Sequence, residues 1–261
     1  MLPCYNEGED IGPLVRKWMD MRAPLRLAGY ELSVYCIDDK SKDDTNAVIR
    51  QLAKDFPGAV HLIEHEVNKG LGGGLRTSFQ FFYDNGREGD LCVLMDGDNT
   101  HDPIYVLDMI PKIKAGNDCV IASRYCAKSE TMGVSGLRLF MSWGAKQFYT
   151  LLLGVRNVRD YTCGYRAYTY DLIARAKNTY GDLLVEKRSF ACMMEVLYKL
   201  SLIDARFAEI PFELRYDHKQ GESKMRIIRT ARESMGTAIH LRAGKHKFKK
   251  SRNTSEPRGD A

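Results

Sequence analysis

Short apolar runs alternate with longer amphipathic stretches along the first half of the chain. The runs have the length of buried β-strands and occupy residues 1–5, 32–37, 60–64, 91–95 and 118–123. Between them, apolar residues recur at helical spacing in residues 7–27, 45–55, 75–84 and 103–113. Strands that alternate regularly with helices predict an α/β fold with a doubly wound, mostly parallel sheet and helices on both faces.

The second half of the chain alternates less regularly. The expected helices are residues 136–153 and 190–202, and the expected extended segments are residues 160–170 and 208–215. We expect these elements to pack on the same core as the first half. The sequence therefore predicts one domain over residues 1–224, with halves at 1–125 and 126–224, followed by a basic C-terminal helix or tail at 225–261.

The composition is that of a soluble globular protein. Of the 261 residues, 44% are hydrophobic and 28% are charged, and no apolar run approaches the roughly 18 residues of a membrane-spanning helix. We expect no signal peptide, because residues 1–7 lack a charged and apolar leader. The seven cysteines are scattered without a Cys-x-x-Cys pair, which favours reduced thiols in a cytoplasmic protein over disulfides or a zinc site.

Basic residues concentrate near the C-terminus, in residues 219–252, and the net charge of the chain is +5. Such a segment is typical either of a solvated end or of contact with an anionic membrane surface. Basic residues interleaved with aromatic ones do not occur elsewhere, so we expect no nucleic-acid partner. The protein is then either free in the cytoplasm or peripheral on the cytoplasmic face of a membrane.

Two carboxylates follow the apolar run at residues 91–95. If the chain stays extended, Asp96 and Asp98 point to the same side, because strand side chains alternate between faces. Paired carboxylates suit Mg²⁺ or Mn²⁺ that carries phosphate oxygens, and Gly97 leaves room for a ligand. The alternative is a polar turn without metal, since such turns are rich in Asp and Gly. Asp102 and Pro103 then predict a helix start.

Acidic residues also follow two other predicted strands, at Glu7 and at Asp38 and Asp39. Since parallel strands bring their carboxyl ends to one edge, these residues and the Asp96–Asp98 pair predict one acidic crevice. The glycine-rich loop at residues 68–74 adds backbone N–H groups and Lys69 for phosphate. It does not match a Walker A or G-x-G-x-x-G pattern, and a flexible helix start explains the glycines equally well.

A set of motifs in chain order resembles a known family. The motifs are Pro3–Glu7, Ile37–Ser41, Asn68–Gly72, Met95–Asp98, Ser123–Tyr125, Asp160–Arg166 and Gly221–Lys224. Together they resemble family 2 glycosyltransferases of the GT-A fold, and in particular the branch of dolichol-phosphate mannose synthases and bacterial polyprenyl-phosphate glycosyltransferases. The resemblance spans residues 3–224 and makes residues 1–125 the nucleotide-sugar-binding half and residues 126–224 the acceptor-side half.

The resemblance implies a role for individual residues. Nucleotide-sugar binding is implied for Pro3, Tyr5, Glu7, Ile37, Asp39, Lys69, Asp96, Gly97, Asp98 and Lys224. Asp96 and Asp98 would hold the metal, and Arg124, Arg138 and Ser142 would bind the acceptor phosphate. Arg138 and Ser142 are four residues apart on a predicted helix, so they share one face. The chain departs from the family at Thr100, where Gln is usual, at Cys163, where Ser is usual, and at His218, where Arg is usual.

The reaction that the resemblance implies is inverting, metal-dependent transfer of a sugar from a donor of the GDP-mannose or UDP-hexose type to a polyprenyl or dolichyl phosphate. Asp98, Arg124 and Asp160 are the candidate catalytic residues. A first alternative is a soluble enzyme of the same fold with a hydroxyl acceptor, which would need a base such as Asp160 or Glu195. A second alternative is a non-catalytic nucleotide-sugar-binding or membrane-scaffold protein.

Overall fold

The computed structural model describes residues 1–132, 136–215 and 232–244, with the side chains of residues 137–141 outside the description. The strands are β1 (Leu2–Cys4), β2 (Val34–Asp38), β3 (Val60–Glu64), β4 (Leu91–Leu94), β5 (Cys119–Ala122), β6 (Glu130–Met132), β7 (Arg166–Thr169), β8 (Phe207–Ile210) and β9 (Glu213–Arg215). The α-helices are α1 (Gly8–Asp20), α2 (Arg22–Leu27), α3 (Thr45–Asp55), α4 (Gly70–Asn85), α5 (Val106–Lys114), α6 (Gly136–Leu153), α7 (Tyr170–Tyr180) and α8 (Ala191–Ser201), and residues 232–244 are also helical.

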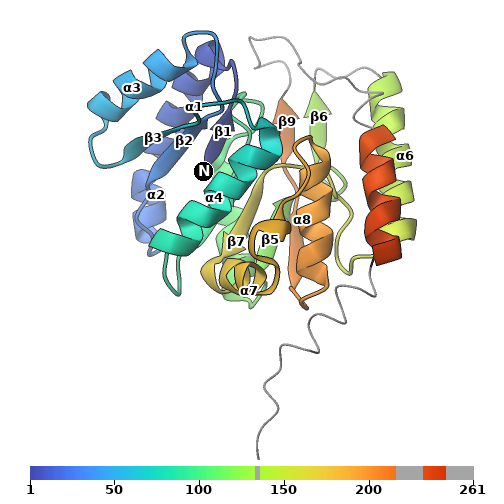
Figure 1. The fold of residues 1–261 in the computed structure, drawn as a ribbon. Coiled ribbons are helices and arrows are strands. Elements are labelled where there is room, and N and C mark those ends of the chain that lie inside the picture. The colour runs from blue at the N-terminus through green and yellow to red at the C-terminus, as the bar shows by residue number, and fades with distance from the viewer. Residues whose placement is uncertain (133–135, 216–231, 245–261) are drawn as a thin grey trace, which may run out of the picture.

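A mostly parallel sheet runs through the molecule (Figure 1). β1, β2 and β3 are parallel, and β5 is parallel to β8. The backbone nitrogen of Met1 donates to the carbonyl oxygen of Val93 at 2.8 Å, and the N–H of Met95 donates back to Met1 at 3.3 Å. This is the pattern of parallel strands, so the sheet continues from β1 into β4.

One strand runs against the rest of this sheet. β7 lies between β4 and β5 and is antiparallel to both. The described strands therefore follow the order β3-β2-β1-β4-β7-β5-β8, and β6 pairs with β9 in a separate two-stranded sheet. The predicted α/β fold with a doubly wound, mostly parallel sheet is confirmed.

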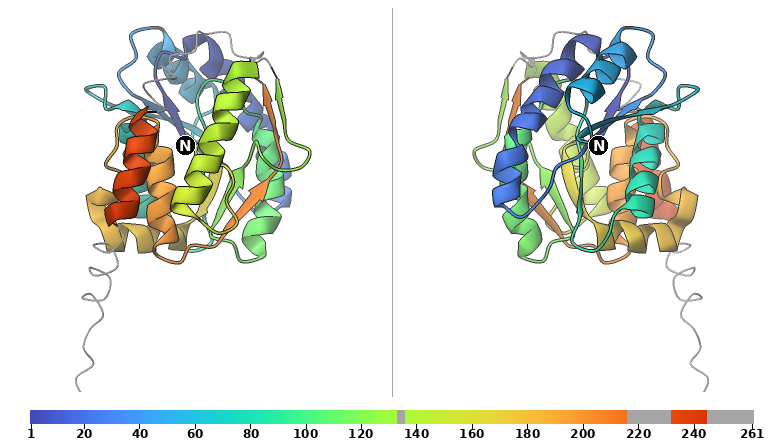
Figure 2. Two further views of the ribbon diagram at one scale, coloured as in Figure 1. Left: turned by 90° about the vertical axis from the view of Figure 1, so that its right-hand side faces the viewer. Right: turned by 90° about the vertical axis from the view of Figure 1, so that its left-hand side faces the viewer.

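Helices cover both faces of the sheet. α1 packs against α3, and α5 packs against β5, β7 and β8 on that face, whereas α4 packs against α7 and α8 on the opposite face (Figure 2). The apolar stripe predicted for the first helix is buried, with Ile11, Leu14 and Val15 fully enclosed. α6 lies beside helical residues 232–244 at the end of the molecule away from β3 (Figure 1).

The predicted elements differ from the observed ones mainly at their ends. The helix expected at residues 7–27 is divided at Met21 into α1 and α2, and the helix expected from Leu75 already begins at Gly70. The extended segment expected at residues 160–170 narrows to β7. Neither α7 nor β6 is predicted. No helix in the described part of the chain has both the length and the apolar character to cross a membrane.

Candidate functional site

The carboxyl ends of β1, β2 and β4 lie together at one edge of the sheet. The N–H of Asp39 donates to the carbonyl oxygen of Cys4 at 2.9 Å. A Cβ added to Gly97 would lie 2.8 Å from Sγ of Cys4 and 3.2 Å from the carbonyl oxygen of Pro3. The lack of a side chain at Gly97 therefore allows the chain to pass close to β1. The acidic strand ends meet as the sequence predicts.

The residues implied to surround the nucleotide form one side of this edge. Pro3, Tyr5 and Glu7 are half-buried, and the N–H of Glu7 donates to Oγ1 of Thr45 at 2.8 Å. Pro3 pairs in register with Ile37 of β2. Ile37 is fully buried, so its side chain belongs to the core and presents no surface at the edge.

The carboxylate of Asp39 holds the start of the glycine-rich loop. It accepts hydrogen bonds from the N–H of Lys69 at 2.7 Å and from the N–H of Gly70 at 2.8 Å. Nδ1 of His65 lies 2.7 Å from Oδ1 of Asp39, and both side chains are buried. Asp39 therefore contributes to the edge of the site indirectly, because it fixes the start of the glycine-rich loop.

The glycines of this loop make room for another segment of the chain. A Cβ on Gly72 would lie 1.7 Å from the carbonyl oxygen of Lys187, and one on Gly70 would lie 2.6 Å from that of Arg188. The N–H of Gly72 donates to Arg188 at 3.0 Å. The N–H groups of Lys69, Gly70 and Gly72 are thus bonded within the protein, which differs from the expected phosphate cradle. The side chain of Lys69 is exposed.

The chain bends where the Asp96–Asp98 pair was expected to remain extended. β4 ends at Leu94, before the first of these carboxylates. Oδ1 of Asp98 accepts hydrogen bonds from Oγ1 of Thr100 at 2.7 Å and from its N–H at 3.3 Å. A Cβ on Gly164 would lie 2.9 Å from Oδ1 of Asp96. Thr100 therefore orients Asp98, and Gly164 leaves space for the Asp96 carboxylate.

The acidic pair fits a divalent cation that is also bound by substrate. Two carboxylates are a typical protein contribution to a Mg²⁺ site whose remaining ligands are phosphate oxygens and water. Within the described residues, no group of three or more His, Cys, Asp and Glu side chains could hold a metal by itself. The assignment of Asp96 and Asp98 as metal ligands stays a prediction.

An arginine is fixed at the end of β5 by a buried carboxylate. Nε of Arg124 donates to Oδ2 of Asp160 at 2.8 Å, and Nη2 donates to Oδ1 at 2.7 Å. Nη2 also donates to Oγ1 of Thr162 at 2.6 Å. The side chain of Asp160 is 0% exposed and that of Arg124 is 20% exposed. The guanidinium is therefore anchored on one side and reaches solvent on the other.

The charge of Asp160 follows from this geometry. Burial alone would raise the pKa of Asp160, but Arg124 and the hydrogen bonds to the carboxylate outweigh burial and lower the pKa to about 2. Oδ1 also accepts the N–H groups of Thr162 and Cys163, at 3.2 and 3.0 Å. A carboxylate with this pKa and these partners is a weak base, so the geometry favours a positioning role for Asp160.

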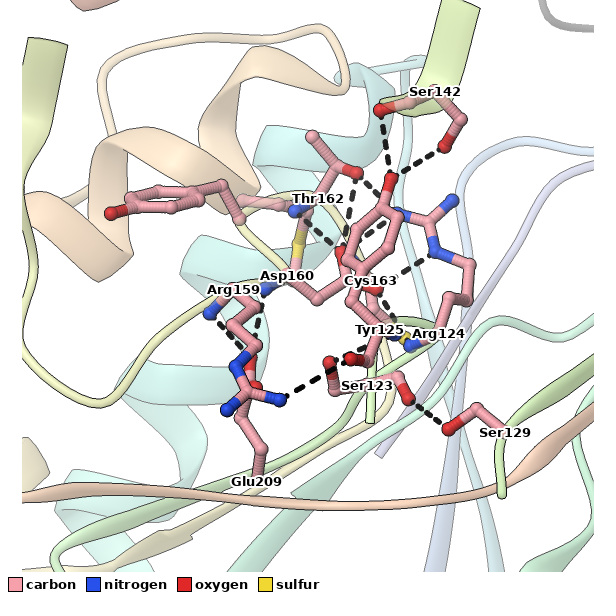
Figure 3. A network of polar contacts seen from close by, with 12 residues as sticks. Ser123, Arg124, Tyr125, Ser129, Ser142, Arg159, Asp160, Thr162, Cys163 and Glu209 are labelled. Carbon is pink, nitrogen blue, oxygen red and sulfur yellow. Dashed lines mark hydrogen bonds and ion pairs between the residues drawn. The ribbon is translucent and has the colours of Figure 1, made fainter. Parts of the chain in front are cut away.

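Glu209 of β8 supports the same turn from below (Figure 3). Its Oε1 accepts the N–H of Arg159 at 2.7 Å and the N–H of Asp160 at 2.8 Å. Burial raises the pKa of Glu209. The carboxylate of Glu209 therefore holds the turn that carries Asp160, and the carboxylate of Asp160 holds Arg124.

Ser142 of α6 lies next to this anchored arginine (Figure 3). The hydroxyl of Tyr125 is 2.8 Å from the carbonyl oxygen of Ser142 and 2.7 Å from its Oγ. Cζ of Arg124 is 5.5 Å from the centre of the Tyr125 ring. The structure thus brings together two of the three predicted acceptor residues. The side chain of Arg138 and the whole of Lys224 lie outside the described residues.

Glu195, the other candidate base, is buried and committed to the segment that packs on the glycine-rich loop. Its Oε2 accepts the N–H groups of Glu186 and Lys187, at 3.0 and 2.9 Å. Its Oε1 accepts Nζ of Lys199 at 2.8 Å, and both side chains are at most 1% exposed. Glu195 therefore fixes the backbone of Glu186 and Lys187.

His101 packs between the acidic turn and the anchored arginine. Its ring stacks on Phe212 with centroids 5.4 Å apart, and Nδ1 lies 3.1 Å from Oγ1 of Thr100. Burial lowers the pKa of His101 to about 4, and the charges of Asp98 and Arg124 also act on it. A neutral His101 therefore fills the space between these two groups.

Several supporting residues are not found by the sequence analysis. They are Tyr125, Thr162, Arg188 and Glu209. Tyr125 and Thr162 lie within the motifs Ser123–Tyr125 and Asp160–Arg166, but the sequence analysis predicts no role for either of them. Arg188 and Glu209 act across long separations in the chain, and no local pattern indicates them.

The sheet order is that of an open α/β fold, a class in which ligands bind beyond the carboxyl ends of the strands, where the acidic strand ends and the anchored arginine lie. The model of the family described as glycosyl transferase family 2 matches residues 1–175. The chain belongs to this family and is a glycosyltransferase. In its fold it is a GT-A enzyme.

Among characterised relatives, the chain is 28% identical to the undecaprenyl-phosphate mannosyltransferase of Micrococcus luteus, over 86% of both chains. It is 27% identical to the polyprenol monophosphomannose synthase of Mycolicibacterium smegmatis, over 86% of this chain and 79% of that protein. A solved glucosyl-3-phosphoglycerate synthase from Mycobacterium tuberculosis, in complex with Mn²⁺ and UDP-glucose, has a TM-score of 0.62 at 17% identity. That similarity covers 93% of this chain and 77% of the solved one, and it shows the fold.

Proposed function

We propose that the protein transfers a hexose from a nucleotide-diphospho-sugar to a polyprenyl phosphate, with inversion at the anomeric carbon. The observation that carries this proposal is the segment of residues 160–164. Its Asp160 fixes Arg124, and its Gly164 lies against the carboxylate of Asp96. A site for an anionic acceptor and a site for a metal-bound diphosphate are therefore built on one short piece of backbone. The similarity to an undecaprenyl-phosphate mannosyltransferase and to a polyprenol monophosphomannose synthase supports this acceptor class.

The proposed reaction exchanges one phosphate ester for another. An oxygen of the acceptor phosphate forms a bond to the anomeric carbon while the bond from that carbon to the donor diphosphate breaks. The nucleoside diphosphate leaves with the electron pair of that bond. The acceptor oxygen is ionised at neutral pH, so the reaction needs no strong base. The carboxylates of Asp160 and Glu195 are already occupied by hydrogen bonds within the protein, which agrees with a reaction that needs no strong base.

The acidic and the basic residues of the site would have different roles in this reaction. Asp96 and Asp98 would hold Mg²⁺ or Mn²⁺, which supplies positive charge to the leaving diphosphate. Arg124 would receive the acceptor phosphate on the side that faces away from Asp160. Arginine suits this role because its planar donors match phosphate oxygens.

Transfer assays can establish donor and acceptor together. Purified protein with Mg²⁺ or Mn²⁺ would be given radiolabelled GDP-mannose or UDP-glucose and either farnesyl phosphate or farnesol. We expect label to move to the phosphate and not to the alcohol, and the productive donor identifies the sugar. Transfer to farnesol, or donor hydrolysis without transfer to either compound, would contradict the proposal and favour a hydroxyl acceptor.

Asp98→Asn tests the proposed metal site. The variant removes one negative charge and keeps the shape of the side chain, so its hydrogen bonds to Thr100 can remain. We expect metal-dependent binding of the donor to weaken at least about tenfold, because a charged ligand contributes more than about 1.5 kcal/mol. Calorimetric titration with GDP or UDP, with Mn²⁺ and with EDTA, measures this change. Equal binding by both proteins under both conditions would refute the assignment.

A further inference from the structure

The anchored arginine does not supply enough positive charge for the proposed acceptor. Arg124 is paired with Asp160 through two hydrogen bonds, so the pair is neutral as a whole. A phosphate monoester carries nearly two negative charges at pH 7, because its second pKa is about 6. A site for such a group needs a cation that no carboxylate already compensates. This step rests on the function proposed above.

Lys146 of α6 is placed to be that cation. Its Nζ lies 5.0 Å from the centre of the Tyr125 ring, and Cζ of Arg124 lies 5.5 Å from the same centre. The two cations therefore share one aromatic side chain at the site. Within the described part of the chain, Lys146 forms no ion pair, whereas Arg124 does.

The helix places Lys146 on the face that carries the predicted acceptor residues. Ser142 and Lys146 are four residues apart on α6, so their side chains are neighbours. Lys146 is half-buried, while Trp143 and Gln147 on the neighbouring positions are exposed. Tyr125 contacts both Ser142, through its hydroxyl, and Lys146, through its ring. This face of α6 is therefore turned towards the end of β5.

We infer that Lys146 is a binding residue for the acceptor phosphate and adds, beside the predicted Arg138, positive charge that Arg124, neutralised by Asp160, does not supply. Tyr125 contacts the ammonium group of Lys146 through a cation–π interaction, which holds it at the site. The lysine then favours the phosphate over the free alcohol and the dianion over the monoanion.

Binding of farnesyl phosphate tests this inference without turnover. Calorimetric titration of wild type, Lys146→Gln and Lys146→Arg would give the affinity at pH 5 and at pH 7.5, beside the affinity for GDP or UDP with Mn²⁺. We expect Lys146→Gln to weaken farnesyl phosphate binding about tenfold at pH 7.5 and less at pH 5, where the phosphate is a monoanion. Lys146→Arg should bind as wild type does, and nucleotide affinity should not change.

Lys112→Gln is the matched control, because Lys112 is an exposed lysine of α5 and loses the same charge. It should bind as wild type does. Equal farnesyl phosphate affinity in wild type and Lys146→Gln would overturn the inference, as would a parallel loss of nucleotide binding or an effect that does not depend on pH. If wild type itself does not bind farnesyl phosphate, the proposed function and this inference both fail; if only the Lys146 effect is missing, the proposed function stands.

Discussion

At the residue scale, the site depends on carboxylates that hold backbone N–H groups in place. Asp39 fixes the start of α4, Glu195 fixes residues 186 and 187, Glu209 fixes the turn before β7, and Asp160 fixes the residues after that turn. Each of these carboxylates is wholly or mostly buried, so an unmet hydrogen bond there is costly. These four acidic residues therefore hold the backbone of the site in place.

Asp160→Asn separates a positioning role from a catalytic base. The variant leaves Arg124 without its counter-charge, and breaking a buried ion pair costs about 3–5 kcal/mol of unfolding free energy. We expect transfer to farnesyl phosphate to fall about a hundredfold, because a displaced arginine no longer aligns the acceptor. Nucleotide affinity should stay within about twofold. Urea unfolding, kinetics and titration with nucleotide measure these effects.

Thr162→Val is the control for Asp160→Asn, since it removes one hydrogen bond from Arg124 and leaves the ion pair, at a cost of about 1 kcal/mol. Acid titration adds an independent test. The pKa of Asp160 is lowered to about 2 from an unfolded value of about 3.9, so its stabilising effect is complete above about pH 4 and is lost as the pH falls towards 2. The stability difference between wild type and Asp160→Asn should be constant from pH 5 to pH 8. A difference that changes near neutral pH would contradict this.

At the element scale, the sequence predicts the bounds of those helices and strands that have a regular local periodicity. The helix Thr45–Asp55, the strand Val60–Glu64 and the helix Gly136–Leu153 have the predicted bounds, because their apolar spacing is regular and turn residues flank them. The antiparallel direction of β7 depends on its pairing with β4 and β5, which no local pattern encodes. The same limit applies to the site. The motifs indicate Arg124 and Asp160 singly, but their ion pair joins residues 36 positions apart.

Gly72→Ala tests the packing of α4 against residues 186–188. The added methyl group would lie 1.7 Å from a backbone oxygen, so the backbone of one segment must move. We expect the unfolding free energy to fall by about 2 kcal/mol or more, since overpacking a close backbone contact costs about 1–3 kcal/mol. Gly144→Ala, in α6, has nothing within 4 Å of the added atom and should gain about 0.5–1 kcal/mol. Urea unfolding of both variants decides the point, and similar stabilities would contradict the packing argument.

At the scale of the whole molecule, the two predicted halves share one sheet and one core. β7 and β8 of the second half pair with β4 and β5 of the first, and a single cluster of buried apolar residues extends from Leu2 in the first strand to Leu241 near the end of the described chain. The boundary predicted near residue 125 therefore divides a single continuous sheet. It does not correspond to a gap in the core.

Buried thiols on either side of that boundary test whether the halves unfold together. Cys36 in β2 and Cys192 in α8 are both fully buried, and burial raises the pKa of each thiol. In the folded protein both should resist alkylation, because thiolate is the reactive form. As urea increases, we expect the two cysteines to become reactive at the same concentration, since unfolding one half exposes the core of the other. Mass spectrometry of the labelled peptides measures both midpoints, and half-exposed Cys126 provides an internal control for reagent activity. A lower midpoint for Cys36 would contradict a single domain and would mean that the first half unfolds as a unit of its own.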